Sequence, residues 1–195
     1  MAAPAALPCA IFLLLAFALA GVAHVAWLKS RWSQPFAWPL DGGVTWRGRR
    51  IFGDNKTMRG FMMMPLAAAF AFAAVAALRE QLPVWLASGI WPLPPGQMAW
   101  LGAISGLAFL LAELPNSFFK RRLDVAPGTA PTQPRLRVVC LVVDRCDSTI
   151  GVLLALSLLV PLATATWFWA LLLGVGLHAL FSIWLYQLRI KRRAL

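Results

Sequence analysis

The chain has 195 residues, of which 61% are hydrophobic and only 13% charged, and its formal net charge is +11. Such a composition excludes an ordinary soluble domain and indicates an integral membrane protein. The basic residues lie mostly in short loops between apolar runs, as anionic membrane lipids and the orientation rule for membrane helices require, so the net charge does not indicate nucleic acid as a partner.

Five apolar stretches are long enough to cross a bilayer, for which about 20 residues are needed. They are residues 7–28, 61–78, 98–114, 138–163 and 167–188. We therefore expect an all-α integral membrane protein with about five transmembrane helices, forming one domain over residues 1–195. Prolines precede the third stretch and Glu113 ends it, so we expect that helix to be tilted, short or partly re-entrant.

The distribution of Lys and Arg predicts the orientation of these helices. Seven lie between the first two stretches and five between the third and fourth, whereas the second loop has one and the last has none. Cytoplasmic loops carry the excess of positive charge, so we expect the N-terminus outside and the C-terminus in the cytoplasm of a multi-pass protein of the cytoplasmic membrane. No basic residue precedes the first stretch, which favours a retained helix over a cleaved signal.

Most of the acidic residues lie in three short polar clusters that are also rich in Lys and Arg. The clusters are residues 39–60, 113–122 and 144–148. On the predicted topology all three face the cytoplasm together. This pattern indicates a phosphate-binding site at a membrane surface, with anionic lipids among its partners.

The third cluster holds an acidic pair within an apolar stretch. Asp144 and Asp147 are three residues apart, so on a helix they project from one face, which Ser148 and Gly151 continue. Two such carboxylates need a cation, because an unpaired charge inside a membrane is costly. Hard carboxylate oxygens favour Mg²⁺, which keeps positions free for water and substrate phosphates. The alternative is a structural ion pair with Arg145 or with a basic residue of another helix.

The second cluster offers groups that suit an anion. Asn116, Ser117 and Lys120 share one helical face, and two arginines follow Lys120. Pro115 suits the first turn of a helix, so we expect a helix to start there and to favour phosphate at its N-terminus. Glu113 could complete a metal shell. Taken alone, the basic triplet could instead be a simple cytoplasmic stop signal.

The first cluster intersperses glycines with basic residues, which gives polyphosphate both close backbone approach and cationic donors. The spacing of a P-loop is absent, because Lys56 and Thr57 follow Gly53 too closely and no strand pattern precedes them. A flexible connector is the alternative interpretation of this loop.

Two residues stand apart from these patterns. His24 lies in the first apolar stretch and belongs to no cluster, so we interpret it as a packing or interhelical hydrogen-bonding residue. Trp46 lies inside the first cluster, whereas most of the other tryptophans are near the ends of predicted helices, as in an interfacial belt.

The clusters together resemble a known family. Residues 39–60 resemble the first cytoplasmic loop of the archaeal CDP-archaeol synthase family, with the pattern P-[LIV]-D-x-G, G-R-R-I-x-G, K-T-x-R-G. The matching residues are Pro39, Asp41, Gly43, Gly48, Arg49, Arg50, Gly53, Lys56, Thr57, Arg59 and Gly60. The other clusters resemble the signature S-x-x-K-R and D-x-x-D, shared with bacterial phosphatidate cytidylyltransferases. The matching residues there are Ser117, Lys120, Arg121, Asp144 and Asp147.

The resemblance implies that the phosphate of a membrane lipid attacks the α-phosphorus of CTP and releases pyrophosphate, with Mg²⁺ as cofactor. The residues expected to be catalytic are Asp144, Asp147 and Lys120, and those expected at the metal are Asp144, Asp147 and Glu113. The residues expected to bind the nucleotide or its phosphates are Lys56, Thr57, Arg59, Asn116, Ser117, Lys120, Arg121, Arg49 and Arg50.

The chain departs from the family at two places. Ala112-Glu113 stands where the family often has Gly-Asp, and the D-R-x-D of the acidic pair is closer to the phosphatidate enzymes than to the archaeal D-Q-x-D. Phosphatidate and archaetidic acid are therefore both open as lipid substrates.

Two other functions compete with this prediction. A CDP-alcohol phosphotransferase also uses intramembrane aspartates, but its pattern D-G-x-x-A-R-x8-G-x3-D-x3-D is absent from the sequence. A non-enzymatic lipid-binding or carrier protein would explain the basic loops and would leave the intramembrane acidic pair unexplained.

Overall fold

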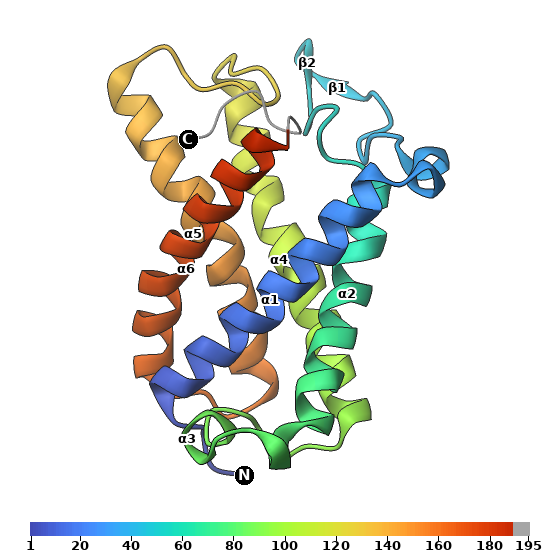
Figure 1. Ribbon diagram of the computed structural model, residues 1–195. Helices are drawn as coiled ribbons and strands as arrows, with labels where there is room; N and C mark the ends of the chain where they lie inside the picture. The colour runs from blue at the N-terminus through green and yellow to red at the C-terminus, as the bar shows by residue number, and fades with distance from the viewer. Residues whose placement is uncertain (189–195) are drawn as a thin grey trace.

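The computed structural model describes residues 1–188, and its long helices pack side by side in a bundle (Figure 1). The long helices are α1 (Ala6–Lys29), α2 (Met58–Ala77), α4 (Pro95–Arg122), α5 (Pro134–Leu159) and α6 (Thr164–Gln187). The shorter elements are η1 (Arg31–Phe36), β1 (Thr45–Trp46), β2 (Arg49–Arg50), η2 (Arg79–Gln81) and α3 (Val84–Ala87). The prediction of an all-α membrane protein is confirmed, and the only strands of the described part form a short antiparallel hairpin.

Four helices within residues 1–188 have the length and apolar composition to cross a membrane. They are α1, α2, α4 and the Thr164–Trp184 part of α6. The fifth long helix, α5, has 26 residues, but Asp144, Arg145 and Asp147 interrupt its apolar sequence. A total of five crossings and the direction of the bundle across the membrane therefore stay predictions. The predicted cytoplasmic C-terminus, residues 189–195, lies outside the described residues.

The helix α4 differs from the expectation. The sequence predicted a short or re-entrant third helix and a new helix beginning at Pro115, but α4 is a single helix of 28 residues that continues through Pro115. Pro95 stands at the first helical position, where its missing N–H costs nothing. A proline inside a membrane helix is tolerated because neighbouring helices and local adjustments satisfy the backbone group that has lost its hydrogen bond. No helix N-terminus is therefore available at Pro115 to bind phosphate.

Helices α2 and α4 pack closely because glycines face the backbone of α2. A Cβ atom at Gly102 would lie 2.4 Å from the carbonyl oxygen of Ala68, and one at Gly106 would lie 2.8 Å from the carbonyl oxygen of Met64. Small residues are the usual means of close helix association in membranes, where there is no hydrophobic driving force between helices. This contact fixes α4 against α2. The C-terminal end of α4, which carries the second polar cluster, is thereby held in a defined position.

The elements that carry the polar clusters meet at one end of the bundle. Figure 1 shows the β1–β2 hairpin, the last turns of α1 and α4 and the first turns of α5 at this end, whereas α3 and the N-terminus lie at the other. At the N-terminal end the packing is aromatic, with the rings of Phe12 and Phe72 4.9 Å apart and those of Phe12 and Trp91 6.2 Å apart. The polar clusters and the aromatic packing thus lie at opposite ends of the bundle.

We expect Gly102→Ala to destabilise the protein by about 2 kcal/mol, because the new methyl group would force α2 and α4 apart. The matched control is Gly96→Ala in the first turn of the same helix, where a Cβ atom would meet nothing within 4 Å. The thermal unfolding temperature of the two variants in detergent tests this. Equal unfolding temperatures would show that the close contact is absent.

Candidate functional site

The acidic pair of α5 lies against α4. The side-chain amide of Asn116 donates to Oδ1 of Asp144 at 2.6 Å and to Oδ2 of Asp147 at 2.8 Å. The ammonium group of Lys120, one turn further along α4, forms an ion pair with Asp144. The structure thus brings the second and third clusters together, with both carboxylates converging on one amide group.

The first cluster reaches the same helix. The ammonium group of Lys56 forms an ion pair with the carboxylate of Glu113, and both side chains are largely buried. Lys56 stands just before α2, so this pair joins the loop after α1 to the middle turns of α4. The expectation that all three clusters lie together is confirmed.

Arg121 of the second cluster forms no ion pair within the described part of the chain, although Asp54 is close enough to interact with it electrostatically. Only 8% of the residue is exposed, and its Nε and Nη1 atoms are buried without a hydrogen bond. Gly53 covers it, since a Cβ atom at Gly53 would lie 3.7 Å from Cδ and Nε of Arg121 and 2.9 Å from Cγ of Pro127. Buried guanidinium nitrogen atoms without hydrogen bonds are unfavourable, so this guanidinium is suited to an anionic ligand.

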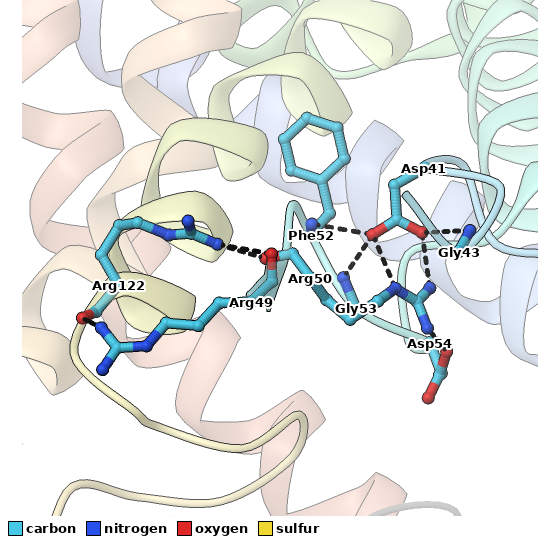
Figure 2. Close-up of polar contacts among 8 residues, drawn as sticks. All are labelled: Asp41, Gly43, Arg49, Arg50, Phe52, Gly53, Asp54 and Arg122. Atoms are coloured by element: carbon cyan, nitrogen blue, oxygen red, sulfur yellow. Dashed lines mark hydrogen bonds and ion pairs between the residues drawn. The ribbon is translucent and has the colours of Figure 1, made fainter. Parts of the chain in front are cut away.

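The carboxylate of Asp41 organises the loop that carries Gly53 (Figure 2). Its side chain is fully buried. It accepts hydrogen bonds from the backbone N–H groups of Gly43, Phe52 and Gly53 at 3.2, 2.9 and 3.0 Å and from the guanidinium of Arg50 at 2.5 and 3.3 Å. Burial alone would raise the pKa of Asp41, but the hydrogen bonds from Arg50 and the backbone lower that pKa well below its usual range.

The two arginines of β2 are engaged within the loops. The Arg50 guanidinium pairs with Asp41 at 2.5 Å and with Asp54 at 2.7 Å, and the Arg49 guanidinium pairs with Asp124 at 2.5 Å. These contacts give both residues a part in folding the loop, and their assignment to phosphate binding stays a prediction.

The remaining predicted phosphate ligands lie around the start of α2 and on α4. Thr57 precedes the first residue of α2 and forms an isolated β-bridge with Pro39. Arg59 has its Nε atom buried without a partner, and its carbonyl oxygen accepts a hydrogen bond from the Trp27 indole at 3.1 Å. Ser117 is buried on α4. These residues lie in the same polar region, and their individual roles stay predictions.

The donor set of the acidic pair fits a hard divalent cation. Two carboxylates face the side-chain amide of Asn116. If this amide is rotated by about 180°, its carbonyl oxygen can also be a ligand for Mg²⁺. The described residues contain no group of three or more carboxylate, imidazole or thiol side chains placed to hold a metal, and Glu113 pairs with Lys56 instead. The assignment of Glu113 as a third metal ligand therefore lacks support from its contacts.

His24 is a residue of this region that the sequence motifs did not identify. Its Nε2 atom lies 3.5 Å from the position of a Cβ atom on Gly60, so α1 contacts the first turn of α2 there. The imidazole is also close enough to Glu113, Arg59 and Lys56 to interact electrostatically with them. An isolated histidine in an apolar stretch carries no motif, so only its contacts reveal this position.

Known proteins resemble the chain in sequence and in fold. The CarS-like family, described as CDP-archaeol synthase, matches residues 35–194. A CDP-archaeol synthase of Pyrococcus furiosus is 37% identical over 93 residues, 46% of this chain and 48% of that protein. One of Methanococcoides burtonii is 33% identical over 133 residues, 67% of this chain and 69% of that protein. The chain spans about half the length of the Pyrococcus relative that it matches.

A solved structure of an intramembrane enzyme for archaeal membrane lipids biosynthesis has the same fold. It matches with a TM-score of 0.62 and 24% identity, over 89% of this chain and 92% of the other. The fold and the polar site thus define a multi-pass membrane protein with a polar, cation-rich site at one end of a helical bundle. From the match over most of its length, the chain belongs to the CDP-archaeol synthase family.

We expect Asp41→Asn to destabilise the protein by about 3 kcal/mol. The substitution removes the negative charge of a buried carboxylate that pairs with Arg50 and accepts three backbone hydrogen bonds. The control is Asp124→Asn, which breaks an exposed pair with Arg49 and should cost less than about 1 kcal/mol. Thermal unfolding measures both. Equal losses would contradict the central role of Asp41.

The lowered pKa of Asp41 also predicts a pH dependence of stability. A carboxylate whose pKa is lower in the folded state stabilises the fold above its unfolded pKa of about 3.9, and this contribution is lost as the pH falls through the folded value. The wild type should therefore lose stability below about pH 4 more steeply than Asp41→Asn. Unfolding temperatures measured from pH 6 downward test this, and parallel curves would contradict it.

Proposed function

We propose that this protein is a CTP-dependent cytidylyltransferase that converts a membrane lipid phosphate to a CDP-activated lipid and releases pyrophosphate. Residues 1–195 would act as one domain, with the site open to the cytoplasm. Membership of the CDP-archaeol synthase family supports this reaction, and so does the charge of the site.

The observation that carries the proposal is the buried guanidinium of Arg121, two of whose nitrogen atoms have no hydrogen bond, next in sequence to the Lys120 that pairs with Asp144. Lys120 precedes it in sequence and pairs with Asp144, so cationic and carboxylate groups meet where α4 contacts α5. Phosphates need cationic donors, and a divalent cation on those phosphates needs carboxylates. A nucleoside triphosphate with its metal would supply phosphates to the cationic groups and a cation to the carboxylates.

In the proposed reaction an oxygen of the lipid phosphate forms a bond to the α-phosphorus of CTP, and the bond from that phosphorus to the β-phosphate oxygen breaks. Such a displacement depends on in-line positioning and on neutralisation of charge more than on a protein base. Lys120 and Arg121 would hold the phosphates, and Lys56 with Arg59 would contact the triphosphate or the lipid phosphate. Asp144, Asp147 and Asn116 would hold Mg²⁺, which neutralises charge on the phosphates when it is bound.

The lipid substrate is proposed from the relatives. Their name, CDP-archaeol synthase, favours an archaetidic acid with ether-linked chains over phosphatidate. The basic loops at the hairpin end would also contact anionic lipids of the membrane surface. Incubation of the purified protein with labelled CTP, Mg²⁺ and a panel of phosphatidic and archaetidic acids tests the reaction and the substrate together.

We expect Asp144→Asn and Lys120→Ala each to lower the rate of CTP incorporation into lipid by at least about 100-fold, because each removes a charge placed on the reacting phosphates or their metal. The control is Glu80→Gln in η2, an acidic residue remote in sequence from the three clusters, which should retain activity. Unfolding temperatures check that the variants are folded. Normal turnover in folded Asp144→Asn would reject the assignment.

A further inference from the structure

Arg122 follows the proposed phosphate ligand Arg121 in sequence, yet its hydrogen bonds go to the hairpin. Nη1 donates to the carbonyl oxygen of Trp46. Nη2 donates to the carbonyl oxygens of Arg49 at 3.0 Å and Arg50 at 2.6 Å (Figure 2). One guanidinium therefore contacts both strands of the hairpin. Only its Nε atom is buried without a partner among the described residues.

The same guanidinium lies on two aromatic rings. Its central carbon is 5.2 Å from the ring centroid of Trp46 and 5.0 Å from that of Phe118, and these two rings stack on each other at 5.6 Å. A planar guanidinium can stack on rings and donate to several carbonyl oxygens at the same time, whereas an ammonium group cannot. The position therefore requires arginine specifically, beyond its positive charge.

The hairpin also donates a hydrogen bond to the end of α4. The guanidinium of Arg49 donates to the carbonyl oxygen of Arg122 and pairs with Asp124 at 2.5 Å. The last turn of α4 and the hairpin are thus joined by bonds in both directions.

This connection bears on the nucleotide site through chain continuity. Gly53, which covers the guanidinium of Arg121, follows β2 by three residues, and Arg121 precedes Arg122 by one. Fixing Arg122 to the hairpin therefore fixes the loop over Arg121. We propose that Arg122 is a positioning residue, which holds the hairpin so that the loop at Gly53 and the guanidinium of Arg121 form a ready-made pocket for a nucleotide phosphate. This inference rests on the proposed function.

The test compares Arg122→Ala and Arg122→Lys with Arg47→Ala in the full-length protein in nanodiscs. Arg47 provides a matched control, because its guanidinium lies 4.8 Å from the same Trp46 ring and carries the same charge, but has no hydrogen bond to the part of the chain that the structure describes. Binding of labelled CTP with Mg²⁺ is measured without lipid, and KM for CTP and kcat are measured with it.

Without its anchor the loop samples conformations that do not bind, and the apparent affinity falls in proportion. We expect Arg122→Ala to weaken CTP binding and raise KM for CTP by about 10-fold, with kcat within about 2-fold of wild type, since Arg122 does not touch the reacting atoms. Arg122→Lys should show most of the same decrease in CTP affinity as Arg122→Ala. Arg47→Ala should bind CTP as the wild type does.

The outcomes separate the two proposals. Wild type that binds no CTP would overturn the proposed function and this inference with it. Wild type that binds CTP, with equal affinity in Arg122→Lys or in Arg122→Ala, would overturn the positioning role alone, as would an equal loss in Arg47→Ala. If Arg122→Ala does not fold, Arg122→Lys decides the matter, since it keeps the charge and the side-chain length. Faster trypsin cleavage within residues 45–50 of folded Arg122→Lys is expected as a direct sign of a released hairpin.

Discussion

The site depends on ion pairs that cross between elements in a region of low dielectric. Lys120 of α4 meets Asp144 of α5, and Lys56 of the first loop meets Glu113 of α4. A charge inside an apolar bundle is tolerated only with a partner, so these pairs determine which surfaces of the helices can face each other. The polar end of the bundle is therefore held together by the same groups that are proposed to bind the nucleotide.

This dual use has a consequence for ligand binding. In the structure the carboxylate of Asp144 is satisfied by Lys120 and Asn116, so the ligand-free site is largely neutral. If a nucleotide binds with Mg²⁺ as proposed, the cation takes over the carboxylates and the ammonium group becomes available to the phosphates. An exchange of partners of this kind would keep the carboxylates and the ammonium group paired once the ligand is bound. Arg121 differs, because it forms no ion pair among the described residues that a ligand would have to replace.

Apolar length and charge distribution were enough to predict most of the fold. Four of the five long helices agree with the predicted stretches to within a few residues, whereas α4 extends eight residues beyond its stretch, and the meeting of the three clusters follows from helices that alternate in direction. Pro115 was misleading, because a local signal for a helix start was overridden by packing of α4 between its neighbours. The roles of Asp41 and Arg122 were also out of reach, since their partners are backbone groups whose positions depend on the folded loop.

The basic triplet at the end of α4 shows why composition alone could not assign roles. Lys120, Arg121 and Arg122 are consecutive, so successive side chains point in directions about 100° apart on the helix. Lys120 faces α5, Arg121 lies under Gly53 and Arg122 reaches the hairpin. Lys120 has an ion pair, Arg121 has none, and the guanidinium of Arg122 donates to three carbonyl oxygens. Three adjacent charges that look equivalent in the sequence therefore have different contacts, and Arg121 leaves two buried nitrogen atoms without a hydrogen bond, whereas Arg122 leaves only Nε.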